Sequence, residues 1–91
     1  MTDLFEMRRA FRLSEVLAKL LQLLLTETRV TAQMIEHDYR LSTDAKVAIH
    51  RLRRRLRPYN IRIETLRGDG YWLEQPMKQR IGDAIRGDIA A

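Results

Sequence analysis

The chain lacks cysteine altogether and contains only two prolines, four glycines and one tryptophan among its 91 residues. Without cysteine, neither a disulfide framework nor a thiolate zinc site can hold the fold together. The longest apolar stretch, residues 20–25, is interrupted by Gln22 and is far shorter than the ~20 residues of a membrane span. The N-terminus lacks the charged and apolar regions of a signal peptide. These absences predict a cytoplasmic protein without membrane contact.

Residue patterns that would carry catalysis or bind a metal ion are also missing. His37 and His50 lie thirteen residues apart on different predicted helices, with no carboxylate pattern beside them that would complete a zinc site. Ser14 and Ser42 are explained as helix N-caps, and neither lies in a nucleophile motif. We therefore expect no enzyme activity, no metal, no cofactor and no small-molecule substrate.

Positive charge is concentrated in one part of the sequence. The formal net charge is +5. Residues 46–67 hold eight Lys or Arg against one acid, Glu64, so this segment carries +7 and the other 69 residues together carry −2. A basic patch on a slightly acidic body is typical of a polyanion-binding protein. A solvated helix face or a contact with an acidic protein is the alternative.

Apolar residues at helical spacing predict three successive helices. Ser14 caps the first, which runs to about residues 26–28; its apolar positions are Val16, Leu17, Leu20, Leu21 and Leu24. Thr31 caps the second, residues 32–39, with Met34, Ile35 and Tyr39 inward. Ser42 or Thr43 caps the third, and Pro58 ends it. Its buried stripe is expected to contain Ala45, Ala48 or Ile49, Leu52 and Leu56.

After Pro58 the apolar period changes from about 3.6 to 2, which predicts a β-hairpin. Ile61 and Ile63 on the first strand, and Tyr71 and Leu73 on the second, are expected to face the helices. Residues 67–70, Arg-Gly-Asp-Gly, supply the tight turn.

Pro76 opens a final helix, on which Met77, Ile81, Ile85 and Ile89 recur every four residues. This stripe either packs on the domain or pairs two copies of the chain.

Three helices followed by a hairpin predict an α+β fold, a winged helix-turn-helix with an extra C-terminal helix. The expected organisation is an N-terminal arm (residues 1–12) of undecided structure, a winged-helix domain (13–74) and a C-terminal amphipathic helix (75–91). With the apolar stripe buried, the third helix turns its basic side outward. The candidate major-groove residues are Thr43, Lys46, Val47, His50, Arg51, Arg53 and Arg54.

The remaining candidates lie at the edges of this surface. Arg57 is a candidate for the DNA backbone, as Arg53 and Arg54 also are, and Arg67 and Gly68 are candidates for wing contacts. Arg55 lies closest to the buried stripe and is expected to be structural as readily as DNA-binding. Trp72 is expected to point away from the core face, where it contacts a sugar or a partner chain, or is covered by the C-terminal helix.

The segments 45–56 and 63–73 together resemble the recognition helix and wing of the OmpR/PhoB-type effector domains of bacterial response regulators. The most specific part is Thr-Leu-Arg-Gly-Asp-Gly-Tyr at residues 65–71, and the likeness covers about residues 13–74. It implies groove contacts by Lys46, Val47, His50, Arg51 and Arg53. It also implies that Arg67 approaches the minor groove or backbone and that Tyr71 packs under the wing.

The chain departs from that family in several places. These 91 residues hold no receiver domain ahead of the basic segment, and only about a dozen residues stand where the family has a four-stranded sheet. The connection at residues 40–42 is shorter than the family's polymerase-contacting loop. Lys46 replaces a commonly acidic residue, and Trp72 replaces a basic or polar one. We therefore expect a stand-alone DNA-binding protein rather than a phosphorylation-driven activator.

The leading expectation is thus a sequence-specific binder of double-stranded DNA, associated with the nucleoid, which regulates transcription by occupancy in a bacterium or phage. Two alternatives stay open. One is a small protein-interaction module that binds a transcription factor or polymerase, and the other is an architectural or DNA-processing winged helix. A homodimer through Met77, Ile81, Ile85 and Ile89, and contact with the transcription machinery, are further expectations.

Overall fold

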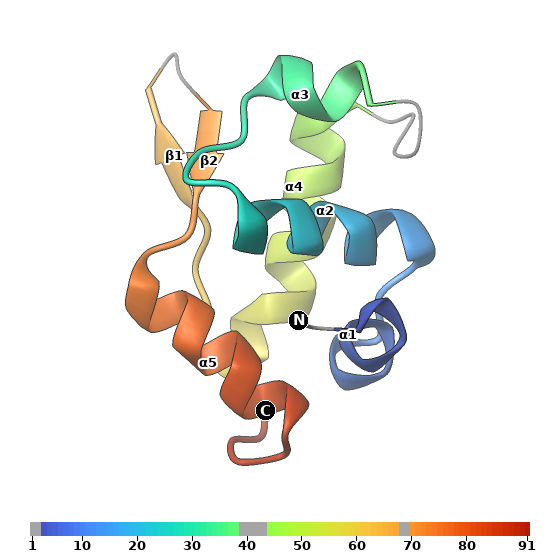
Figure 1. Cartoon of the computed structure of the whole chain (residues 1–91), viewed down its shortest axis with the longest axis vertical. Coiled ribbons are helices and arrows are strands. Elements are labelled where there is room, and N and C mark those ends of the chain that lie inside the picture. The colour runs from blue at the N-terminus through green and yellow to red at the C-terminus, as the bar shows by residue number, and fades with distance from the viewer. Residues whose placement is uncertain (1–2, 39–43, 68–69) are drawn as a thin grey trace.

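The computed structural model describes residues 3–38, 44–67 and 70–91. Within these ranges the chain forms five α-helices, one 3-10 turn and one antiparallel hairpin (Figure 1). In chain order they are α1 (Leu4–Phe11), α2 (Glu15–Thr26), α3 (Ala32–Glu36), α4 (Ala45–Leu56), η1 (Arg57–Tyr59), β1 (Glu64–Leu66), β2 (Gly70–Trp72) and α5 (Gln75–Ile85). The expected α+β class is confirmed.

Polar side chains at the N-caps determine where the central helices begin. The hydroxyl of Ser14 accepts from the Leu17 N–H at 3.2 Å, and that of Thr31 accepts from the Met34 N–H at 3.0 Å, both as expected. The prediction that Ser42 or Thr43 caps α4 is wrong; both lie outside the described residues. Asp44 is the cap, because its carboxylate accepts from the Val47 N–H at 3.1 Å and also interacts favourably with the helix dipole.

The core forms between α4 and the helices that precede it. Both α2 and α3 pack against α4. The inner stripe of α4 is at most 2% exposed and contains all the expected positions, Ala45, Ala48, Ile49, Leu52 and Leu56. From α2 the core receives Leu17, Ala18, Leu20, Leu21 and Leu24. Helix α3 ends at Glu36, earlier than expected, and buries Ile35; Tyr39 lies outside the described residues.

The N-terminal segment, undecided from its sequence, is a docked helix. In α1, Met7 and Phe11 are at most 2% exposed. The ring of Phe11 meets the ring of Tyr59 edge-on at 5.0 Å, and the Tyr59 hydroxyl donates to the carbonyl oxygen of Ala10 at 2.9 Å. One hydrophobic cluster therefore extends from Met7 to Ala84, across the boundaries expected at residues 12–13 and 74–75.

The hairpin is shorter than its alternating pattern predicts. Ile61 and Ile63 are buried, as expected, but only Glu64–Leu66 pairs as a strand, with Thr65 opposite Tyr71. Tyr71 also exchanges two backbone hydrogen bonds of 2.8 Å with Val30, in the segment between α2 and α3.

Gly70 allows this close approach of two backbones. Its φ is +115°, and a Cβ atom there would lie 2.3 Å from the Val30 carbonyl oxygen. Any other residue would displace the hairpin from the α2–α3 segment.

The last helix ends at Ile85, not near residue 89 as its four-residue stripe predicts. Gly87, with φ +80°, reverses the chain, and the N–H groups of Gly87 and Asp88 donate to the carbonyls of Ala84 and Asp83. This is a Schellman motif, which satisfies the carbonyls left at the helix end.

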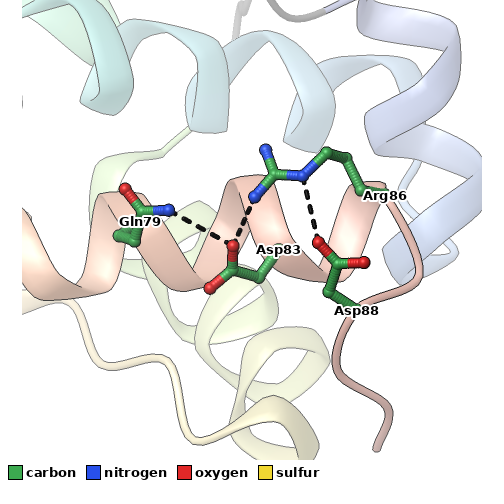
Figure 2. A network of polar contacts seen from close by, with 4 residues as sticks. All are labelled: Gln79, Asp83, Arg86 and Asp88. Atoms are coloured by element: carbon green, nitrogen blue, oxygen red, sulfur yellow. Dashed lines mark hydrogen bonds and ion pairs between the residues drawn. The ribbon is translucent and has the colours of Figure 1, made fainter.

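A polar network reinforces the same end of α5 (Figure 2). The Arg86 guanidinium donates to the carboxylates of Asp83 and Asp88, and the Gln79 amide donates to Asp83 at 3.3 Å. These contacts hold the turn at residues 86–88 to the helix.

The apolar stripe of α5 faces the protein's own core. Ile81 is 1% exposed, and Met77, Ile85 and Ile89 are half-buried against the same hydrophobic cluster. Of the two expectations for this stripe, packing on the domain is confirmed.

Among the described residues, no helix is long and apolar enough to cross a bilayer.

Candidate nucleic-acid interface

One face of α4 is buried and the other is exposed and basic. The name outer face of α4 is used for six exposed positions, Lys46, Val47, His50, Arg51, Arg54 and Arg57; Arg55 is also exposed but lies nearer the buried stripe. Arg57 stands at its C-cap. Val47 is the apolar member and is 43% exposed. Over the described residues, no hydrogen bond or ion pair occupies the Lys46 ammonium or the guanidinium groups of this face. Their donors are therefore available to a ligand.

Arg53 differs from its neighbours because its side chain contacts the hairpin. Its guanidinium donates to the Ile63 carbonyl oxygen at 2.8 Å and to the Thr65 hydroxyl at 2.7 Å. It also lies 5.8 Å from the centroid of the Tyr71 ring, in cation–π geometry. The expectation for Arg53 was a DNA contact, and its sequence position gave no sign of these bonds. The structure shows it tying α4 to β1.

Arg55 is exposed, although it was expected to lie closest to the buried stripe. Of the three consecutive arginines at residues 53–55, Arg53 is the half-buried one. The difference arises because the hairpin lies beside α4 and covers the flank that carries Arg53. Helical spacing alone does not reveal on which flank a later segment will pack.

Two other expected residues belong to the hairpin region. Arg67, directly after β1, is exposed, and Tyr71 is half-buried beneath the Arg53 guanidinium. Thr43 and Gly68 lie outside the described residues. Figure 1 shows β1 and β2 beside the half of α4 that is nearer α3.

Trp72 lines a surface groove on the outside of the hairpin. The groove has a volume of about 560 Å³, and its other lining residues are Glu27, Thr28, Arg29 and Leu66. Trp72 is half-buried there, and Leu66 is 36% exposed. Trp72 thus borders the segment between α2 and α3. The alternative expectation was that the C-terminal helix covers it, but the residues that line this groove do not come from α5.

A second cavity, of about 590 Å³, lies where α4 passes through η1 into β1. Its lining residues are Arg53, Arg57, Asn60, Ile61, Arg62, Ile63 and Glu64. Asn60 and Arg62 were not among the candidate residues. The chain bends at Asn60, which has a left-handed backbone conformation with φ +58°. Asparagine tolerates this conformation, so an asparagine shortly after Pro58 is the signal that could have indicated the bend.

Residues that could bind a metal ion do not gather in the described ranges: no three His, Cys, Asp or Glu side chains lie together there. His37 and His50 are both exposed.

No protein-family model matches this chain, and neither does any curated protein or solved structure. The surface geometry and its chemistry are therefore what supports a function.

Proposed function

We propose that this chain is a sequence-specific double-stranded DNA-binding protein that regulates transcription by occupying its site. The outer face of α4 carries the proposal. It presents unoccupied cationic side chains and one exposed apolar side chain on a helix whose other face is held in the core. A rigid helix of this kind fits the major groove, which is wide enough to admit it. In this proposal α3 and α4 form a helix-turn-helix, and β1 and β2 form the wing.

Base reading is assigned to the first half of α4. Lys46 and Arg51 can donate to guanine O6 and N7, His50 to a base-edge acceptor, and Val47 can pack against a thymine methyl group. Thr43, just before the helix, belongs to the same set. Arg54 and Arg57 lie farther along the helix and are assigned to phosphates, which require positive charge and no particular base.

The wing is assigned to the backbone or minor groove beside the recognition helix. Arg67 would make this contact, together with Gly68 in the adjoining turn. The bonds of Arg53 to Ile63 and Thr65 support this assignment, because they hold β1 at a fixed position relative to α4. Fixing the strand that leads to Arg67 reduces the ordering needed when DNA binds, which favours affinity.

Selection of bound sequences from a random duplex pool tests the proposal. We expect one recurrent motif after several rounds. Recovery of the starting sequence distribution would contradict sequence-specific binding.

The wing assignment has its own test in Arg67→Ala. This variant should bind the selected duplex more weakly, by about 1 kcal/mol, and unfold at the wild-type temperature, because the side chain is exposed. Arg9→Ala is the matched control, since Arg9 is an exposed cation on α1. Equal affinities of the two variants would remove Arg67 from the interface.

The groove beside Trp72 favours a second candidate function, a module that binds a transcription factor or polymerase. Its half-buried indole and the exposed Leu66 offer an apolar contact of the type enriched at protein interfaces. Such a module would bind its partner with little dependence on salt and would protect no DNA from cleavage. A protected footprint that Trp72→Ala leaves intact would favour the DNA-binding function.

A further inference from the structure

The cavity at the C-terminal end of α4 combines several donors for an anion. Arg57 stands at the C-cap of α4, Asn60 in the turn that follows η1, and Arg62 in the extended segment leading to β1. The cavity is lined by three guanidinium groups and by one carboxylate, that of Glu64. The net charge of its lining is therefore +2. An anion that enters is therefore attracted from several sides.

The three arginines of this cavity are not equivalent. Arg53 forms one wall and uses its guanidinium to bind the Ile63 carbonyl and the Thr65 hydroxyl. Arg57 and Arg62, in contrast, have no side-chain hydrogen bond or ion pair over the residues that the structure describes. Both side chains are exposed, so their guanidinium donors are available to an anion that enters the cavity.

The backbone around the cavity is fixed independently of any ligand. Arg80 donates twice to the Tyr59 carbonyl, at 3.1 and 2.9 Å, which holds η1 against α5. The Arg62 N–H lies 3.3 Å from the Met77 sulfur, also on α5. Ile61 and Ile63 on either side of Arg62 are buried, at 2% and 5% exposed. Arg62 consequently projects from an anchored segment, not from a free loop.

We propose that this cavity binds a phosphate group, with Arg57, Arg62 and the Asn60 amide as donors. Guanidinium groups suit phosphate because their planar donors match two oxygens at once. The phosphate comes either from a DNA strand that continues past α4 or from a free phosphate compound. A phosphate from DNA rests on the proposed function. The ability of the cavity to bind a phosphate group does not depend on it.

The distance along α4 is compatible with a DNA strand as the source. Arg57 lies eleven residues after Lys46, which corresponds to about 16.5 Å at the helical rise per residue. This is comparable to the width of the major groove, about 12 Å. With α4 lying across one groove, a base contact near Lys46 can therefore be combined with a phosphate contact by Arg57, at the end of α4, and Arg62, in the segment that follows η1.

The test combines two titrations of the full chain with Arg62→Gln and, as matched control, Arg9→Gln. In the first, the selected duplex is titrated at several salt concentrations. Arg62→Gln should lower affinity about five- to tenfold and make the slope of log K against log salt shallower by about 1. Arg9→Gln should match wild type, and both variants should unfold at the wild-type temperature.

In the second titration, inorganic phosphate is added at constant ionic strength while backbone amide chemical shifts are recorded. Shifts confined to residues 57–64 in wild type, and lost in Arg62→Gln, support the site. Arg62→Lys, which keeps the charge but not the planar donors, should restore binding only in part.

The outcomes separate the sources and the two proposals. An effect on duplex binding assigns a DNA phosphodiester, and phosphate shifts without a duplex effect assign a free phosphate compound. If the wild type binds no duplex but shows the phosphate shifts, the proposed function fails and the site survives. If Arg62→Gln binds duplex as wild type does and no shifts cluster at residues 57–64, the site is overturned and the DNA-binding function stands.

Discussion

The two faces of α4 are made of different residues and do different work. The inner stripe is aliphatic and at most 2% exposed, and it joins α2 and α3 in the core. The outer face is exposed and mostly cationic, and among residues 3–38, 44–67 and 70–91 its cations have no hydrogen-bonded or ion-paired partner. The inner face therefore provides the packing that stabilises this helix. Residues on the outer face contribute little to that packing, so they can serve binding without a loss of stability.

Arg53 stands between the two faces and shows why residue type does not assign a role. Arg54 follows it directly and is exposed, whereas the Arg53 guanidinium is bonded to the hairpin. Both are arginines in a run of three. The position of the neighbouring strand, not the sequence of the run, decides which one is structural.

The largest expected effect belongs to the inner face. Leu52→Ala removes a fully buried side chain and should lower the free energy of unfolding by about 2–5 kcal/mol. Urea denaturation measures this change. A loss below about 1 kcal/mol would mean that the stripe does not hold α4, and the contrast between the faces would disappear.

On the outer face we expect the opposite pattern. Arg51→Gln should weaken binding to the selected duplex by about 1–3 kcal/mol and change the free energy of unfolding by less than about 0.5 kcal/mol. Fluorescence anisotropy and urea denaturation give the two values. A variant that binds normally, or one that unfolds easily, would contradict the division of roles.

Arg53→Ala should destabilise the protein less than Leu52→Ala and should loosen the hairpin. Loss of the bonds to Ile63 and Thr65 should reduce the free energy of unfolding by about 1–2 kcal/mol and accelerate amide exchange in β1 and β2. Arg54→Ala is the matched control and should leave hairpin exchange unchanged. Identical exchange in the two variants would show that Arg53 does not secure the wing.

Regular periodicity predicted much of this fold. The caps Ser14 and Thr31, the inner stripe of α4 and the inward residues of the hairpin all follow from spacing and side-chain chemistry. Helix α1 did not, because it spans only eight residues and charged residues alternate irregularly with its apolar ones, so no clear period emerges. The cap of α4 was misassigned because three consecutive residues, Ser42, Thr43 and Asp44, can all serve as caps.

The spacing of residues along the sequence could not predict which distant parts of the chain contact one another. The pairing of Val30 with Tyr71 and the bonds of Arg53 to Ile63 and Thr65 depend on where the hairpin packs. The cavity containing Arg57 and Arg62 has the same origin, since it forms where α4, η1 and β1 meet. The outer face of α4 was largely predictable because burial of one helix face dictates exposure of the other.

Titration of the selected duplex against salt concentration tests the central claim most directly. If the outer face of α4, the wing and the cavity arginines neutralise about six to eight phosphates, log K should fall against log salt with a slope of about −5 to −7. A slope near zero would contradict DNA binding by this basic surface.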